Sequence, residues 1–311
     1  MNRILFFTGL FLLTALAKAQ TSSLNEAVIK NDRDAIIVLL NNGSDVDAYD
    51  ADSDNVIINA AIYASKENLK LILDHHANPN LPNKAGQTAL MFCTEDTVRM
   101  SMLVSYGARI NDSSYSGNTA FLIACGGFDK YISVKWLLDH GADIYAKRWR
   151  TETALMRAAQ ASDTLTIGLL LDSGFDINAH PWGFTPLMYA VRFGNWGAVP
   201  FLMRRGADAN IADDEGNPPV AWAASAGQAD AVRCMLAGTK NLNTVATRTG
   251  MTPLMWAVYS EYDHPEIIQA FIDHGADINQ RSTDGKTALV WAMKKGNTKT
   301  VALLKKLGAK T

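Results

Sequence analysis

The sequence GFTPLMYA at residues 183–190 returns almost unchanged as GMTPLMWA at residues 250–257. Looser copies run along the whole chain, 31 to 35 residues apart, with the threonine or its replacement at positions 55, 88, 119, 153, 185, 218, 252 and 287. Self-similarity at a period of about 20 to 50 residues is typical of a repeat protein, whose units bury their apolar faces only by stacking. The length alone would suggest two domains, but the repeats predict one continuous solenoid.

The start of each copy has the chemistry of a helix N-terminus. Thr185 and Thr252 can accept a backbone N–H as N-caps, and the prolines that follow suit the first helical position, where no N–H is needed. An alanine five residues after the threonine position keeps this first helix thin, which lets neighbouring repeats stack closely. These alanines are Ala124, Ala158, Ala190, Ala223, Ala257 and Ala292.

A second phrase follows each copy, as in LLDHGADI at residues 137–144 and FIDHGADI at residues 271–278. Its apolar pairs, such as Leu137-Leu138, are expected to bury a second helix against the stack. Its glycine stands where that helix ends, a position that favours left-handed backbone. The aspartate two residues later is expected to shape the turn at the base of the next loop. The glycines are Gly107, Gly141, Gly174, Gly206, Gly275 and Gly308.

These two phrases, at a period near 33 residues, resemble the ankyrin repeat, and the resemblance covers residues 22–311. It implies an all-α solenoid of about nine helix-turn-helix units joined by β-hairpin fingers, in one domain. The family usually has a histidine directly after Thr-Pro-Leu, but this chain has Met188 and Met255 there. Repeat seven has Pro218 in place of the capping threonine and a displaced Gly238, so we expect residues 213–265 to be the weakest part.

The first residues, MNRILFFTGLFLLTALAKAQ, have the layout of a cleavable secretory signal. Arg3 gives a basic start, the apolar stretch is short for a membrane span, and Ala17-Lys18-Ala19 has the small-x-small pattern of a cleavage site. We expect residues 1–19 to be removed after Ala19, which takes the formal net charge from −2 to −4. The mature chain is then expected in a bacterial periplasm or outside the cell, without a membrane span. The alternative is that the first residues form an N-terminal membrane anchor or a buried helix.

Composition and net charge exclude some classes of protein. The 311 residues are 48% hydrophobic and 19% charged, which excludes a disordered chain. The near-neutral charge gives no electrostatic footprint for nucleic acid, so we expect no nucleic-acid partner. We expect a monomer.

The sequence shows no pattern of residues typical of catalysis or metal binding. His75, His76, His140 and His274 fall near the ends of second helices in different repeats, so they should not converge on one ion, since zinc ligands lie about 2.0–2.3 Å from one centre. No nucleophile elbow, phosphate-binding loop or zinc-protease motif is found. We therefore expect no catalytic residue, no metal and no cofactor.

Three cysteines form an odd count for an oxidising compartment. Cys93 and Cys125 lie at or beside the thin-helix position of adjacent repeats. Stacked helices are about 8–10 Å apart, whereas a disulfide needs Cα atoms within about 7 Å. We therefore expect buried free thiols, with Cys234 in the core, and keep a disulfide as the alternative.

The aromatic residues indicate where a partner could bind. One repeat position, just ahead of the thin-helix alanine, holds Phe92, Tyr189, Trp222, Trp256 and Trp291, and we expect a half-buried ladder rather than a dedicated site. In the family, partners are met by the finger tips, which here carry Tyr115, Trp149, Arg150, Trp182 and Phe184, with Arg192 and Phe193 close by. Exposed aromatic and arginine side chains are typical of binding hot spots. The alternative is that these rings fold back on neighbouring fingers.

The sequence thus predicts an exported, non-catalytic scaffold that binds another protein on its finger face. One alternative is an inhibitor or immunity-type protein that blocks an enzyme or toxin. Another is an envelope stress-protective factor that uses its thiols. Fold alone cannot choose among them.

Overall fold

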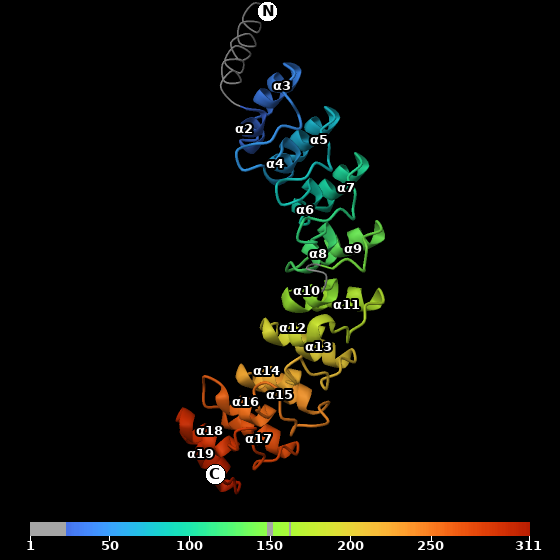
Figure 1. Ribbon diagram of the computed structural model, residues 1–311. Coiled ribbons are helices and arrows are strands. Elements are labelled where there is room, and N and C mark those ends of the chain that lie inside the picture. Colours follow the sequence, from blue (N-terminus) through green and yellow to red (C-terminus); the bar gives the residue numbers. More distant parts are fainter. Residues whose placement is uncertain (1–22, 148–151, 162) are drawn as a thin grey trace, which may run out of the picture. The chain divides into compact units, whose positions relative to one another are not determined.

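The computed structural model describes residues 23–147, 152–161 and 163–311 (Figure 1). The predicted signal sequence with its cleavage after Ala19, and the predicted tip residues Trp149 and Arg150, lie outside these residues. Within them the chain forms nine helix pairs: α2 (Leu24–Ile29) and α3 (Arg33–Asn41), α4 (Val56–Tyr63) and α5 (Lys66–Asp74), α6 (Ala89–Phe92) and α7 (Thr97–Ser105), α8 (Ala120–Cys125) and α9 (Tyr131–Asp139), α10 (Ala154–Ala161) and α11 (Thr164–Asp172), α12 (Pro186–Arg192) and α13 (Ala198–Arg204), α14 (Pro219–Ser225) and α15 (Ala229–Leu236), α16 (Pro253–Tyr259) and α17 (Pro265–Asp273), α18 (Ala288–Lys295) and α19 (Thr298–Lys306).

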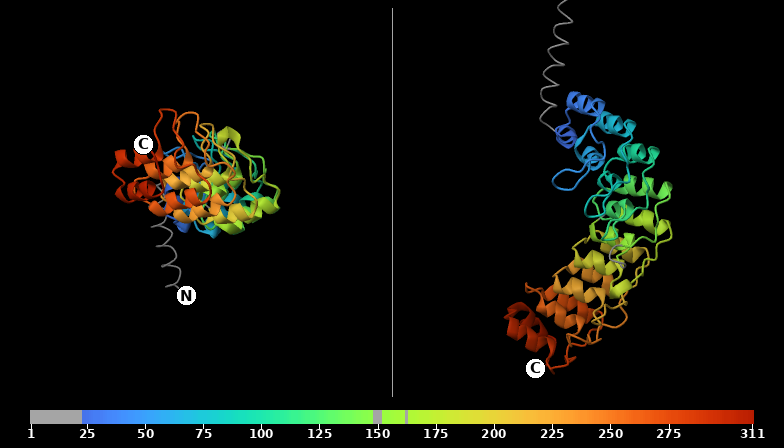
Figure 2. Two further views of the ribbon diagram at one scale, coloured as in Figure 1. Left: turned by 90° about the horizontal axis from the view of Figure 1, so that it is seen from below. Right: turned by 45° about the horizontal axis from the view of Figure 1, so that its top comes forward.

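The contacts divide the chain into two units, one of Met1–Ala124 and Lys130–Arg150, the other of Cys125–Asp129 and Thr151–Thr311. In the first unit α2 contacts α4 and α4 contacts α6, while α5, α7 and α9 form a second row. In the second unit the first helices, α10 to α18, contact one another in order, and so do the second helices, α11 to α19 (Figure 2). This stacking confirms the predicted all-α solenoid; the single domain over 22–311 stays a prediction.

The predicted helix starts are confirmed. The Thr185 Oγ1 accepts the N–H of Met188 at 3.2 Å, and the Thr252 Oγ1 accepts the N–H of Met255 at 3.3 Å. A proline is the first residue of both helices. Pro218 makes no side-chain cap, as expected, and Thr88 also makes none before the four-residue α6.

The helix-ending glycines have the left-handed backbone that the sequence predicts, for example Gly141 with φ 85°. The N–H of Ala142 then donates to the carbonyl of Leu137 at 2.9 Å, which satisfies a carbonyl of the last turn. His76 occupies this position in repeat two and takes φ 66° despite its side chain. Among the described residues of repeat seven, Gly238 is not left-handed, so the displaced glycine does not provide the usual end.

The fingers are tight hairpin loops rather than paired strands. In the finger of repeat three, the N–H of Asn83 donates to the carbonyl of Gln87 at 2.9 Å, and the N–H of Gly86 donates back to Asn83 at 2.8 Å. Gly86 has φ 76°, the left-handed residue that closes such a three-residue loop. An isolated bridge joins Tyr49 and Asn55.

Asparagine side chains tie several finger bases to the next repeat, which the sequence analysis did not anticipate. The Asn210 Oδ1 accepts the N–H of Lys240 at 2.6 Å, and its Nδ2 donates to the carbonyl of Gly238 at 3.0 Å. The same pair of bonds is made by Asn80, Asn111 and Asn243. The recurring aspartates do shape their turns, as predicted: the Asp143 Oδ1 accepts the N–H of Tyr145 at 2.8 Å.

Among the described residues, no helix combines the length and hydropathy that crossing a bilayer needs.

Candidate binding surface

The structure describes five of the seven predicted partner-binding residues at least in part. Tyr115, in the first unit, is 81% exposed, and its backbone N–H donates to Ala85 in the preceding finger at 3.1 Å. The backbone of Trp182 lies in the short 3-10 helix η1 (Pro181–Gly183). Phe184, Arg192 and Phe193 come together in the second unit. Their role in binding stays a prediction.

Phe184 is not a free finger-tip ring. Its ring centroid lies 6.4 Å from Tyr189, edge to face, and 6.3 Å from Trp222. These contacts leave the Phe184 side chain half-buried, so the expectation of a mainly solvent-facing ring is wrong for this residue. Arg192 and Phe193 are exposed, with Phe193 at 49%.

The predicted half-buried ladder is confirmed. Phe92, Tyr189, Trp222, Trp256 and Trp291 are all intermediate in exposure. The last four share one position on α12, α14, α16 and α18, and these helices contact one another in order. Consecutive side chains therefore form a row within the second unit.

Tyr259 extends this row and was missed by the sequence analysis. Its ring lies 6.0 Å from Trp256 and 6.0 Å from Trp291, edge to face with each. It stands three residues after Trp256, one helical turn along, which places it on the same face. We call the seven rings Phe184, Tyr189, Phe193, Trp222, Trp256, Tyr259 and Trp291 the aromatic ridge.

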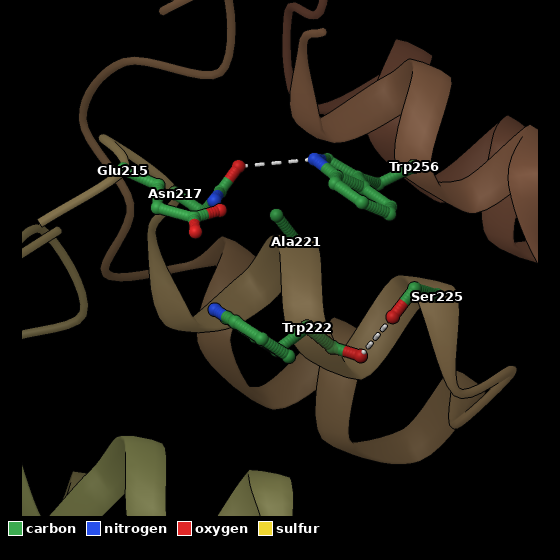
Figure 3. Close-up of a pocket in the computed structure, with 6 residues that line it drawn as sticks. All are labelled: Glu215, Asn217, Ala221, Trp222, Ser225 and Trp256. Carbon is green, nitrogen blue, oxygen red and sulfur yellow. Dashed lines mark hydrogen bonds between the residues drawn. The ribbon is translucent and has the colours of Figure 1, made fainter. Parts of the chain in front are cut away.

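A small pocket opens in the middle of the aromatic ridge, where Trp222 and Trp256 lie on either side of Ala221 (Figure 3). The small alanine side chain leaves the space, of about 60 Å³. Glu215, Asn217 and Ser225 complete the lining. The pocket is far smaller than the roughly 300–1,000 Å³ of a site for a cofactor or a drug-sized ligand, so it suits a single side-chain group.

Both indole N–H groups of the pocket are already bonded. The Trp222 Nε1 donates to Asp213 Oδ2 at 2.9 Å. The Trp256 Nε1 donates to Asn217 Oδ1 at 3.0 Å (Figure 3). The Glu215 carboxylate pairs with the exposed guanidinium of Arg248 on the next finger. What the pocket offers a ligand is therefore the indole surface and the carboxylate of Glu215.

Cations of the chain itself lie over both ends of the aromatic ridge. The Arg192 guanidinium carbon is 5.2 Å from the Phe184 centroid and 5.9 Å from that of Phe193. At the other end, the ammonium groups of Lys286 and Lys294 are 5.1 Å and 5.3 Å from the Trp291 centroid. These distances are within the range of cation–π attraction.

The histidines have a local structural use. The Nδ1 atoms of His75, His140 and His274 each lie 2.7–2.8 Å from the carbonyl oxygen four residues earlier. They therefore bond carbonyls at the ends of second helices, as polar surface residues. No group of three metal-ligating side chains is found in the described part of the chain.

Two of the three cysteines, Cys93 and Cys125, are buried. Cys93 is 2% exposed, and burial raises the pKa of its thiol to about 12. Burial also raises the pKa of Cys125, which is 0% exposed. Cys234 is partly exposed, so the prediction that it belongs to the core is wrong; its pKa is also raised by burial. Reactive cysteines instead have lowered pKa values.

The sequence matches the family model described as ankyrin repeats (3 copies) over residues 24–113, 57–148, 133–213, 187–282 and 220–311. The chain therefore belongs to the ankyrin repeat family. The ankyrin repeat domain of human ASB11 has the same fold, with a TM-score of 0.63 and 20% identity, over 72% of this chain and 100% of that one.

Curated relatives share shorter segments. The chain is 32% identical over 125 residues to the ankyrin repeat, SAM and basic leucine zipper domain-containing protein 1 of Dasypus novemcinctus, covering 39% of this chain and 26% of the relative. It is 32% identical over 146 residues to the mitochondrial disaggregase of Bos taurus, covering 45% and 21%. The chain thus matches about a quarter or less of these relatives' length. Ankyrin repeats generally mediate protein–protein interaction and are non-catalytic.

Proposed function

We propose that this chain is an exported, non-catalytic scaffold that binds a partner protein through its finger tips and the aromatic ridge. The aromatic ridge carries the proposal. A repeat domain needs apolar rings between its helices, but it gains little from exposing Phe193 at 49% and Tyr259 at 45%. Aromatic and arginine side chains on a surface are the composition of binding hot spots.

Two further observations support a binding role rather than chemistry. The pocket between Trp222 and Trp256 suits a side chain and is too small for a cofactor. The raised thiol pKa values disfavour the stress-protective alternative, because a thiolate is the reactive form. An inhibitor or immunity-type protein remains compatible with the same surface, since it would bind in the same way.

Partner capture followed by substitution tests the proposal. The tagged chain is first used to capture a partner from envelope or culture-supernatant extract. Trp149→Ala, Trp182→Ala and Phe193→Ala are then compared with wild type for capture and thermal unfolding. Truncating a hot-spot residue costs about 2 kcal/mol or more in binding, whereas an exposed residue costs about 0.5 kcal/mol or less in folding. We expect capture to fall by more than about tenfold with nearly unchanged melting.

Lys84→Ala is the matched control, because Lys84 is an exposed finger-tip residue of a different repeat from the three variants. Its capture should stay near wild type. Early melting of the three variants would make these side chains packing elements. Normal capture by all three folded variants would place the binding surface elsewhere and contradict the proposal.

A further inference from the structure

The middle of the aromatic ridge differs from its ends in the charges beside the rings. Arg192 covers Phe184, and two lysines flank Trp291. Lys295 lies 4.3 Å from the Tyr259 centroid. Over Trp222 and Trp256, by contrast, no described residue places a cation.

The same place is the acidic part of the ridge. The finger that precedes α14 carries Asp213, Asp214 and Glu215 in succession. Asp213 is buried against the Trp222 indole N–H, and Glu215 lines the pocket. The cation paired with Glu215 is Arg248, whose side chain is 76% exposed and does not line the pocket. The pocket therefore combines indole surface with a carboxylate at its edge.

We propose that the pocket between Trp222 and Trp256 receives the guanidinium group of an arginine side chain from the partner protein. This inference rests on the proposed function and names the chemistry that the surface recognises. Indole rings attract cations through their faces, and Trp is the best of the aromatic residues in this respect. The bonded indole N–H groups leave no donor for an anion, so the charge complementarity of the pocket is for a cation.

Arginine fits the pocket better than lysine. Its planar group stacks on aromatic rings and can bond a carboxylate through two N–H donors, whereas an ammonium is compact and strongly hydrated. The space of about 60 Å³ takes a planar group of a few heavy atoms. The exposed guanidinium of Arg248 already forms an ion pair with the Glu215 carboxylate. An incoming arginine shares this carboxylate with Arg248 or displaces it.

The test uses Nα-acetyl-L-arginine amide as the probe and the full chain labelled with ¹⁵N. The indole N–H resonances of Trp222 and Trp256 are assigned from Trp222→Phe and Trp256→Phe. The amide of Nα-acetyl-L-citrulline is the neutral control, because it keeps the shape and removes the charge. We expect saturable shifts of both indole resonances with arginine, and binding of citrulline at least about tenfold weaker. Equal shifts with the two probes would overturn the arginine site.

Two substitutions should act in opposite directions. Glu215→Gln removes the carboxylate and should weaken arginine binding about threefold to tenfold. Arg248→Ala removes the competing cation and should strengthen it, which loss of a purely structural residue would not do. Glu26→Gln, on an exposed glutamate of α2 in the other unit, is the matched control and should change nothing. Unchanged affinity in both pocket variants would also overturn the site.

Failure of this site can be told apart from failure of the scaffold function. Partner capture that is lost in Phe193→Ala but unaffected by Glu215→Gln keeps the proposed function and overturns the arginine site. Loss of capture in both variants, with normal folding, supports both. Normal capture in Glu215→Gln and in all three folded scaffold variants, Trp149→Ala, Trp182→Ala and Phe193→Ala, overturns both.

Discussion

The indole Nε1 of Trp256 donates a 3.0 Å hydrogen bond to the side-chain oxygen of Asn217, 39 residues earlier in the chain. This bond ties α16 to the finger that precedes α14. Asn217 is only 3% exposed, so its oxygen has little water to replace the indole. Trp256→Phe should therefore lower the free energy of unfolding by about 1–3 kcal/mol, since a buried acceptor is left unsatisfied. Urea denaturation measures the change.

Trp291 offers the matched control for this bond. It occupies the same repeat position and is also half-buried, but its Nε1 is buried with no hydrogen-bond partner in the described part of the chain. Trp291→Phe removes an unsatisfied donor together with a similar ring area, so it should cost clearly less than Trp256→Phe. Equal losses would show that the indole–amide bond contributes nothing.

The starts and ends of the helices could be predicted from the sequence because each depends on one or two neighbouring residues. Thr185 caps its own helix and Pro186 begins it. Gly141 ends α9 through its own left-handed backbone. Periodicity then placed Trp222 and Trp256 in one row. Local patterns can be recognised without knowing what packs against them.

The details of the candidate site were not readable in this way. The bonds of Trp256 to Asn217 and of Trp222 to Asp213 depend on side-chain rotamers and on the distance between repeats. The pocket depends on the small size of Ala221 between two rings of neighbouring helices. Phe184 was expected at a free tip, yet two rings cover it. Such contacts form only when neighbouring repeats stack.

Thiol labelling tests the burial of the cysteines. In native protein at pH 8, a thiol reagent should leave Cys93 and Cys125 unmodified, because both are buried and burial raises their pKa values. Labelling should be confined to the partly exposed Cys234, whereas all three thiols should react in urea. Mass spectrometry of the digested protein identifies the modified residues. Rapid native labelling of Cys93 would contradict its burial.

The raised pKa of Cys93 also predicts a dependence of stability on pH. The thiol has an ordinary pKa of 9.0 and a folded pKa of about 12. Between these values the unfolded state loses the proton and the folded state keeps it, so the thiol's contribution to stability is full below about pH 9 and falls as the pH rises. Relative to Cys93→Ala, the wild type should lose up to about 1.4 kcal/mol per pH unit there. Parallel stability curves for the two proteins would contradict the prediction.

The export prediction concerns the N-terminus. Arg3, the apolar stretch and the Ala17-Lys18-Ala19 pattern predict that the mature chain begins at Gln20. Intact mass of the protein purified from its natural cell should show this start, in periplasm or culture supernatant. Lys18→Pro and Ala19→Leu disturb the cleavage pattern and should leave a longer chain. A wild-type protein that retains Met1, or that occurs only in cytoplasm, would contradict export.

Repeat seven should be the first part of the second unit to open. Both of its helices, α14 and α15, begin without a side-chain cap, at Pro218 and Gln228. The stability of a solenoid is approximately a sum of repeat and neighbour contributions, so local weakness produces local opening. Amides of residues 213–265 should exchange with solvent faster than those of repeats four to six. Uniform protection would contradict this expectation.

A missing cap in repeat seven can be restored at Gln228, the N-cap of α15. Gln228 has φ −92° and ψ 83°, and Asp32 has nearly the same backbone, φ −83° and ψ 94°. The Asp32 carboxylate accepts the N–H of Ala35 at 3.1 Å, so an aspartate at position 228 should accept the N–H of Ala231 in the same way. Gln228→Asp should raise the free energy of unfolding by about 1 kcal/mol and slow exchange in residues 213–265. Asp163→Ala, which removes the corresponding cap of α11, should lower it by about the same amount. Destabilisation by Gln228→Asp would show that the repulsion from nearby Asp230 outweighs the new hydrogen bond.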